Sequence, residues 1–499
     1  MPPDRIHLGE PDGPVAQLNG YLLSIMKSKL INDISASSLQ LIINQICGVA
    51  IFYALSVFFY KNEFGEINWS LAVLLTVFSI LSLGIDQITV KKIAEGLDPS
   101  KILSLYFIHV LITGGVFYLL LLLSWFFIPG FHHNLLVFLG LGKLMIFFAS
   151  PFKQLANGLE KFRLLLYMSV SSNVIRCLLL LVLGIWVQIS LSIVVAIFVA
   201  GDTIELILSM VITKKILRIP WQLQSCRDGY FNLIKSALPQ AGVVVFTSAI
   251  ARFDWIFLGI LASNIALAEY SFAFKVFEVI SLPLLVIAPI LTPRFTRIFR
   301  AVVPVKVAGM EGKLSDLFRF EMIIASAIAL VVNILWTPCI DYISHHKYGA
   351  VNSNTIFVLS ACMPFVYANN FLWNINFARS QLKLIFYIFF VTFFVNVVFD
   401  VVLIPSYGGM GAAIAYLLAV FAQFIFFRVK TGNINFVKND LAIIICPLDA
   451  LASGILATRF LSGLWIIVPF SLLIFLVLLI ITRQVAAGDY GVIRRFVYN

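Results

Sequence analysis

Segments of about twenty apolar residues recur along the whole chain, and they constrain its fold more than any other feature. Apolar residues make up 61% of the 499 positions, and charged residues make up only 12%. A membrane-spanning helix needs about 20 mostly apolar residues to cross the hydrocarbon core. A chain with such a surplus of apolar side chains needs lipid to cover them. The sequence therefore predicts an all-α polytopic membrane protein.

Dividing the chain into segments of this length predicts about 14 transmembrane helices. Short loops are expected between neighbouring segments, among them Phe64–Glu66 after the first and Ala268–Tyr270 after the seventh. The predicted spans are 37–59, 67–89, 102–128, 134–152, 164–187, 190–212, 233–261, 268–293, 318–343, 354–376, 382–404, 411–429, 440–461 and 463–482.

The loop charges predict the orientation of these helices. If both termini lie inside, 28 of the 35 Lys and Arg residues fall in inner loops and tails. Only Lys61, Lys347 and Arg459 then fall in outer loops. Cytoplasmic loops of membrane proteins carry this excess of cations. We expect a multi-pass membrane protein with both termini in the cytoplasm. The net charge of +11 is spread over loops, which argues against a nucleic-acid partner.

Two halves of six helices each are predicted, because the longest polar inner loop lies between the sixth and seventh spans. Parallel repeats of this kind place substrate sites at the interface between the halves. The expected organisation is an N-terminal tail (1–35), an N-lobe (36–213), a linker (214–232), a C-lobe (233–430) and a last segment with two further helices and a C-terminal tail (431–499).

Four cations lie within the predicted spans. They are Lys143, Arg176, Arg252 and Lys275. A Lys or Arg at the bilayer centre costs roughly 2.5–3.5 kcal/mol on insertion scales. Arg presents a planar fork of donors that suits phosphate, and Lys offers a compact charge. These four residues are therefore candidates for binding an anionic head group, with internal ion pairing of the helices as the alternative.

Four intramembrane acids form the second group of candidates. Asp202 and Glu205 are three residues apart, and so are Lys275 and Glu278, so each pair shares a helix face. Arg252 and Asp254 are two apart and should point in different directions. Acids in spans serve proton or cation relays. Asp202, Glu205, Asp254 and Glu278 are thus candidates for ion coupling, with charge balance for the cations as the alternative.

Known signatures of catalysis and metal binding are missing from the sequence. The six cysteines form no CxxC or Cys/His cluster, which argues against a metal site, and no cofactor is expected. The chain has no Walker-type GxxxxGK[ST], no GxSxG and no HExxH. We therefore expect a protein that is not an enzyme and has no catalytic residue.

Six short segments carry recognisable motifs: Leu83–Ile85 and Val90–Ala94 in the first half, and Ser236–Pro239, Ala251–Gly259, Ala268–Lys275 and Leu403–Ala415 in the second. They resemble motifs of the polysaccharide flippases in the MOP (multidrug/oligosaccharidyl-lipid/polysaccharide) exporter superfamily. The family pattern "aLP … riD … lG … Y..a.k" is similar to the second half, and "liP.yG..GAAiA" follows further on. The pattern "lGl … R.ia" is similar to the first half, with Lys where Arg is usual.

The resemblance implies two six-helix lobes around a central cavity, plus two C-terminal helices. It implies a flippase that moves a polyprenyl-diphosphate-linked oligosaccharide, such as an O-antigen, capsule or exopolysaccharide repeat unit, from the inner to the outer leaflet. The alternatives are a cation-coupled multidrug exporter of the same superfamily and a membrane polysaccharide polymerase. Expected partners are the lipid-linked substrate, membrane lipid, and polysaccharide polymerase and chain-length proteins, with the flippase itself a monomer.

Overall fold

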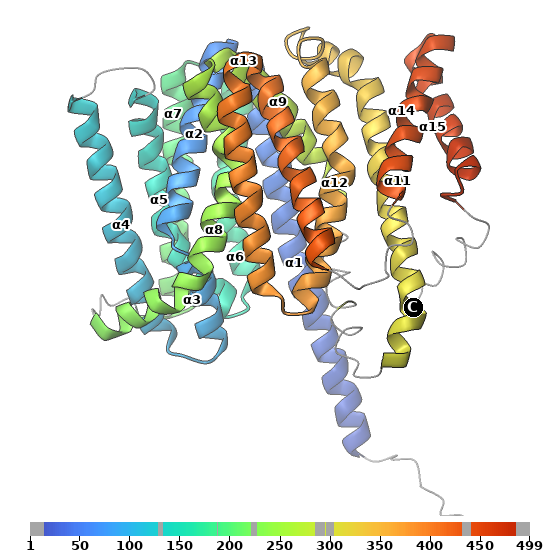
Figure 1. The fold of residues 1–499 in the computed structure, drawn as a ribbon. Coiled ribbons are helices and arrows are strands. Elements are labelled where there is room, and N and C mark those ends of the chain that lie inside the picture. Colours follow the sequence, from blue (N-terminus) through green and yellow to red (C-terminus); the bar gives the residue numbers. More distant parts are fainter. Residues whose placement is uncertain are drawn as a thin grey trace, which may run out of the picture. The chain divides into compact units, whose positions relative to one another are not determined.

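The computed structural model describes residues 14–127, 133–186, 188–220, 227–284, 295, 304–431 and 441–485. Within these residues the secondary structure is helical throughout, without a strand (Figure 1). The ends of the predicted tails, 1–13 and 486–499, lie outside the described residues, and so does the stretch 285–293 of the predicted eighth span. The prediction of an all-α polytopic membrane protein is confirmed.

Two compact units form the chain, and neither is a continuous stretch of sequence. The first unit takes in 1–52, 84–128 and 137–237, and the second takes in 53–83, 129–136 and 238–499. The lobe boundaries at 213 and 233 stay a prediction. The helices of the first unit are α1 (Pro14–Phe58) up to residue 52, α3 (Ile85–Ala94), α4 (Pro99–Phe127), most of α5 (His133–Gly158), α6 (Phe162–Trp186), α7 (Leu191–Val211), the π-helical turn η1 (Ile212–Ile216) and the start of α8 (Arg227–Leu261).

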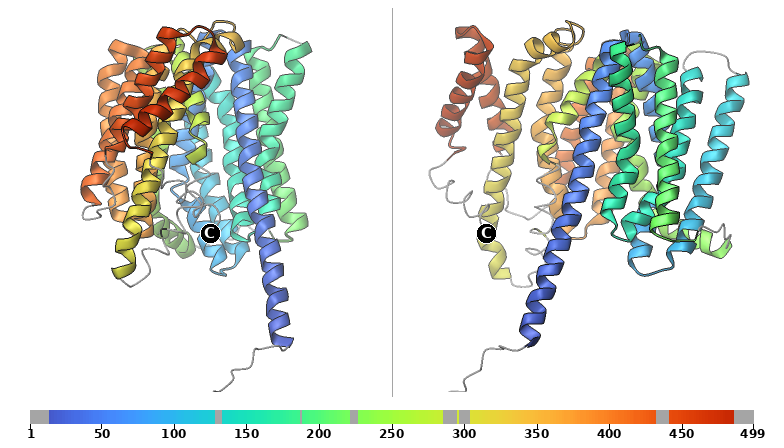
Figure 2. Two further views of the ribbon diagram at one scale, coloured as in Figure 1. Left: turned by 90° about the vertical axis from the view of Figure 1, so that its right-hand side faces the viewer. Right: turned by 180° about the vertical axis from the view of Figure 1, so that it is seen from behind.

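The second unit holds the helices of the second half together with α2. Within it α12 packs along α13 and α11, and α14 pairs with α15 (Figures 1 and 2). The remaining helices of this unit are α2 (Lys61–Leu81), most of α8, α9 (Asn264–Ile280), α11 (Pro304–Ile343), α12 (Ser353–Ala378), α13 (Leu382–Lys430), α14 (Ala442–Phe460) and α15 (Leu464–Ile481).

Twelve helices of the described residues are long and apolar enough to cross a membrane. One of them, α13, has 49 residues and contains two predicted spans, 382–404 and 411–429. At Gly408 its backbone leaves the helical region, with φ 54° and ψ −130°. In a straight helix Thr392 and Val420 would be roughly 40 Å apart, yet both line one cavity. The helix therefore folds back on itself at Gly408, as the predicted turn requires.

The loops predicted after the first and seventh spans are wrong in position. Phe64–Glu66 lies inside α2, which begins at Lys61 because the carboxylate of Glu63 accepts a hydrogen bond from the Tyr60 backbone N–H (3.2 Å). Ala268–Tyr270 lies inside α9, where the Ser263 hydroxyl caps the Ala266 N–H (3.1 Å). Periodicity of apolar residues does not detect caps, so the spans were predicted several residues too late.

The second predicted span, 67–89, also ends too late. Helix α2 stops at Leu81, and Leu83 and Gly84 adopt left-handed backbone angles (φ 49° and 69°) before α3 begins. Glycine reaches this region without steric cost. The result is a sharp turn between α2 and α3, and residues 85–89 belong to α3 instead.

Small residues let α2 approach α8 and α9 closely. A β-carbon at Gly65 would overlap the Asn264 carbonyl, and one at Gly259 would overlap the Trp69 indole ring. Across this contact the Asn68 amide donates to the Ser271 hydroxyl (3.0 Å), and the Trp69 indole N–H donates to the Ile256 carbonyl (3.1 Å). Buried glycine contacts and polar bonds together fix α2 against the first two helices of the second half.

Candidate functional site

Two of the predicted substrate-binding cations, Lys143 and Arg176, meet in the first unit at Asp202. The three residues come from α5, α6 and α7. The guanidinium of Arg176 forms an ion pair with Asp202, and Lys143 Nζ lies 3.4 Å from Asp202 Oδ2. Lys143 and Arg176 are only 7% and 5% exposed, and Asp202 is fully buried. The structure thus joins two predicted cations and one predicted acid that sequence spacing does not link.

A second ion pair lies one helical turn further along α7. Glu205 accepts a hydrogen bond from Lys153 Nζ (2.6 Å) and another from the Ser172 hydroxyl. Lys153 was not among the predicted site residues, because the fourth span was expected to end at residue 152. Helix α5 instead continues through Pro151 to Gly158. The sequence signal that could have found Lys153 is its position just after a proline, since a proline can bend an apolar helix without ending it.

We call Lys143, Lys153, Arg176, Asp202 and Glu205 the α5–α7 charge cluster. Three cations face two carboxylates, so the cluster carries one positive charge in excess. The Phe198 ring supports it, with Arg176 Cζ 4.8 Å and Lys143 Nζ 5.7 Å from the ring centroid. Such cation–π contacts strengthen when water is excluded.

Two glycines bring the backbones of this cluster together. A β-carbon at Gly142 would lie 2.7 Å from Asp202 Oδ2, and one at Gly201 would lie 3.0 Å from Arg176 Cγ. Any larger residue at either position would push the charged side chains apart. The sequence around each cation is thus adapted to close packing of α5 and α6 against α7.

The other two predicted cations, Arg252 and Lys275, share Glu278 in the second unit. Lys275 Nζ lies 2.7 Å from Glu278 Oε2, and Arg252 Nη2 lies 3.7 Å from Glu278 Oε1. Arg252 also stacks on the Trp255 ring, with Cζ 4.6 Å from its centroid. The three charged side chains are 19–29% exposed, so this group on α8 and α9 is more open than the α5–α7 charge cluster. It too carries one cation in excess.

Asp254 points away from Arg252, as its spacing of two residues predicts. Its carboxylate accepts hydrogen bonds from the Tyr270 hydroxyl (2.5 Å) and the Trp255 backbone N–H (2.9 Å) and is almost wholly buried. On α13, Asp400 is also wholly buried, and among the described residues neither of its carboxyl oxygens has a hydrogen-bond partner.

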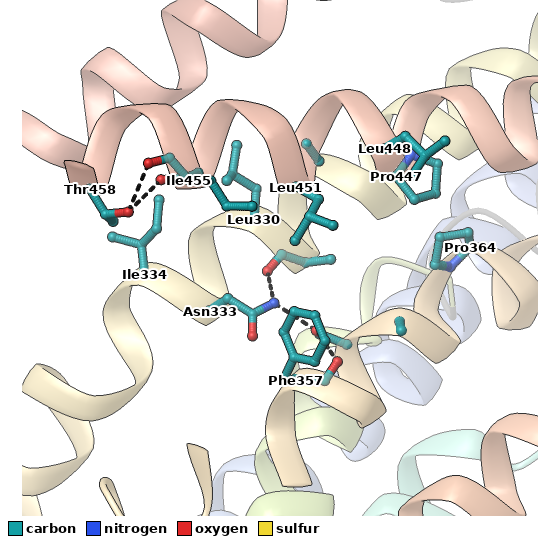
Figure 3. A pocket seen from close by; sticks show the side chains of 15 residues that line it. Leu330, Asn333, Ile334, Phe357, Pro364, Pro447, Leu448, Leu451, Ile455 and Thr458 are labelled. Carbon is teal, nitrogen blue, oxygen red and sulfur yellow. Dashed lines mark hydrogen bonds between the residues drawn. The ribbon is translucent and has the colours of Figure 1, made fainter. Parts of the chain in front are cut away.

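An apolar groove of about 400 Å³ lies between α11, α12 and α14 in the second unit. Its walls include Leu330, Ile334, Phe357, Leu451 and Ile455 (Figure 3). The polar side chains in its wall form hydrogen bonds with other groups of the protein. Asn333 donates to the Ser360 hydroxyl (2.6 Å), and the Thr458 hydroxyl donates to the Gly454 carbonyl (2.8 Å). The remaining surface suits an apolar chain. Among the described residues, no group of three His, Cys, Asp or Glu side chains could hold a metal ion.

Comparison with solved structures assigns the fold. The structure titled lipid II flippase MurJ in an inward closed conformation aligns over 90% of this chain and 99% of its own, with 15% identity and a TM-score of 0.67. An inward-facing multidrug resistance MATE family transporter of the MOP superfamily aligns over 81% of this chain and 99% of its own, with 13% identity and a TM-score of 0.59. A mutant of the Vibrio cholerae MATE transporter VcmN aligns over 83% and 99%, with 12% identity and a TM-score of 0.55. The fold is that of the MOP superfamily transporters.

The family follows from the sequence itself. The model of the family described as "Polysaccharide biosynthesis protein" matches residues 30–299, which is more than half of the chain. The chain belongs to this family, and the resemblance to the flippases of the MOP superfamily is confirmed. Comparison with curated protein sequences gives no match.

Proposed function

We propose that this protein is a flippase that moves a polyprenyl-diphosphate-linked oligosaccharide from the inner to the outer leaflet by alternating access of two lobes. The observation that carries the proposal is the α5–α7 charge cluster, in which Lys143, Lys153 and Arg176 outnumber Asp202 and Glu205 among membrane-spanning helices. Such an excess would attract a diphosphate strongly at low dielectric. The description of the family as polysaccharide biosynthesis proteins supports a saccharide cargo.

The substrate proposed has three chemically different parts, and two of them match features already described. The diphosphate suits the cations Lys143, Arg176, Arg252 and Lys275, and the polyprenyl tail suits the apolar groove between α11, α12 and α14. Asp202, Glu205, Asp254 and Glu278 would balance these charges or couple transport to an ion. The resemblance to polysaccharide flippases supports placement in a bacterial inner membrane, and the distribution of cations among the loops supports cytoplasmic termini.

A cation-coupled multidrug exporter is the second candidate. The buried carboxyl groups of Asp254 and Asp400 favour it, because acids within spans bind or relay cations. The excess of positive charge in both units disfavours it, since a cationic drug would be repelled. A polysaccharide polymerase would need catalytic residues in a long outer loop, and the predicted outer loops are short.

Binding of undecaprenyl diphosphate and export of surface polysaccharide test the proposal together. We expect Arg176→Ala and Arg252→Ala each to weaken binding about tenfold or more and to reduce export at equal protein level. Arg459→Ala is the matched control, because Arg459 is exposed at the end of α14. Normal binding and export in both Arg176→Ala and Arg252→Ala would reject the diphosphate role. Arg176→Lys and Arg252→Lys keep the positive charge but remove the planar guanidinium, so they separate the effect of charge from that of the paired donors.

A further inference from the structure

A second cavity of about 400 Å³ lies within the second unit, between α8, α12 and both arms of α13. Its chemistry differs from that of the charge clusters and of the apolar groove. Amides of Asn369, Asn370 and Gln423 line it, together with the Thr392 and Tyr416 hydroxyls and the Trp373 indole. Among the described residues that line it, none is charged. Its volume lies within the range of small-molecule sites.

The Asn369 side chain is held rigidly at the wall of this cavity. Its Nδ2 donates to the Val420 carbonyl (2.9 Å) and to Gln423 Oε1 (3.0 Å), so both amide hydrogens are used. The residue is 6% exposed, and its Oδ1 is buried with no hydrogen-bond partner among the described residues. A buried acceptor without a partner is energetically unfavourable. A donor from a bound molecule would satisfy it.

The neighbouring polar groups are also fixed. Asn374 Nδ2 donates to the Asn370 carbonyl (2.8 Å), and its contact with Asn370 Oδ1 is longer (3.3 Å). The Thr392 hydroxyl donates to the Ile388 carbonyl (2.8 Å), which leaves its oxygen free to accept. The Trp373 ring stacks on Phe377 with centroids 5.0 Å apart. The cavity therefore presents preorganised acceptors beside an aromatic surface.

This combination selects an uncharged, hydroxyl-bearing molecule. A hydroxyl group both donates and accepts, and amide side chains offer both functions in return. A phosphate would find no cation in the wall, and a purely apolar chain would leave the amides unsatisfied. We propose that the cavity binds an uncharged sugar ring of the lipid-linked saccharide. The inference rests on the proposed flippase function and names the part of the substrate that the cations and the groove do not explain.

Binding measurements on the purified full-length protein in lipid nanodiscs test this proposal with three probes. They are undecaprenyl diphosphate, the same lipid bearing one N-acetylglucosamine, and the same lipid bearing one glucuronic acid. We expect the N-acetylglucosamine lipid to bind about tenfold more tightly than the bare lipid, which corresponds to about 1.4 kcal/mol. We expect the glucuronic acid lipid to bind more weakly than the N-acetylglucosamine lipid.

Two variants probe the cavity itself. Asn369→Leu and Thr392→Val should each remove most of the difference between the N-acetylglucosamine lipid and the bare lipid. Thr392→Val keeps the side-chain shape and serves if Asn369→Leu fails to fold. The matched control is Asn376→Leu on the same helix, because Asn376 is also buried but donates to the Thr431 hydroxyl (2.9 Å) outside the cavity. This control should keep the difference.

The outcomes separate the inference from the function on which it rests. If the wild type binds both the bare and the N-acetylglucosamine lipid equally well, or if both cavity variants keep the difference, the sugar assignment is overturned and the flippase proposal stands. If the glucuronic acid lipid binds more tightly than the N-acetylglucosamine lipid, the proposal that the cavity prefers an uncharged sugar is overturned. If none of the three lipids binds, the flippase proposal itself is overturned and the sugar assignment falls with it.

Discussion

Arg176 and Asp202 face each other across α6 and α7 as an ion pair in which neither side chain is more than 6% exposed. Lys143 reaches the same carboxylate from α5, so one acid serves two cations. Charges placed this deep among membrane-spanning helices are costly unless each has a partner. The arrangement makes Asp202 the residue on which the first unit depends most.

Asp202→Asn is expected to destabilise the protein more than Arg176→Gln. The first change leaves two buried cations without their shared carboxylate, whereas the second leaves Lys143 and Asp202 paired. Breaking a buried ion pair costs about 3–5 kcal/mol. The melting temperatures of the two variants in detergent test this order of stability. Asp228→Asn is the control, because Asp228 is exposed. Equal melting temperatures for Asp202→Asn and wild type would contradict the shared ion pair.

Lys153→Gln is expected to weaken binding of undecaprenyl diphosphate about three- to tenfold, because it removes the positive excess of the α5–α7 charge cluster. Lys153→Arg keeps the charge and should retain most of the affinity. Lys161→Gln is the control, since Lys161 is exposed just beyond the end of α5. The wild-type affinity should fall with rising salt if the cations act electrostatically. Unchanged binding in Lys153→Gln would contradict a binding role for Lys153 and leave that role to the four predicted cations.

A disulfide between α2 and α9 is expected to stop transport. The predicted lobe boundaries place α2 in the N-lobe and α9 in the C-lobe, so alternating access of these lobes would require the packing of α2 on α9 to change. Asn68 and Ser271 touch there with a hydrogen bond of 3.0 Å. Export should be lost when Asn68→Cys/Ser271→Cys is oxidised and should return on reduction. The control pair is Asn376→Cys/Thr431→Cys, which links α12 to the end of α13 at a similar contact of 2.9 Å. Full export with the first disulfide formed would show that this contact does not open.

Gly408→Ala is expected to destabilise the protein by about 1–3 kcal/mol, because a side chain is strained at φ 54°. The second arm of α13 would lose its position against the first, since Gly411 already lies against the Leu403 carbonyl. Gly48→Ala in α1 is the control, because nothing lies within 4 Å of a β-carbon there and Ala favours a helix. Unfolding in detergent compares the two variants, and an unchanged melting temperature for Gly408→Ala would contradict the strained turn.

The family, the helical class and the division of α13 at its glycine turn could all be predicted from the sequence, because they depend on local properties. Apolar segments of bilayer length predict helices wherever they occur, and Gly408 after Pro405 predicts a turn by backbone geometry alone. Helix ends were predicted less well. The caps at Tyr60 and Ser263 depend on single hydrogen bonds that apolar periodicity does not detect.

The partners of the buried charges were decided by the tertiary structure. The sequence identified Lys143, Arg176 and Asp202 as charged residues in apolar surroundings, and it predicted that Asp254 would turn away from Arg252. It did not predict that one carboxylate would serve both cations of the first unit, or that Lys153 would join them. Helices that are far apart in sequence meet according to how their side chains and glycines pack, and that packing alone fixes which charges lie within 4 Å of one another.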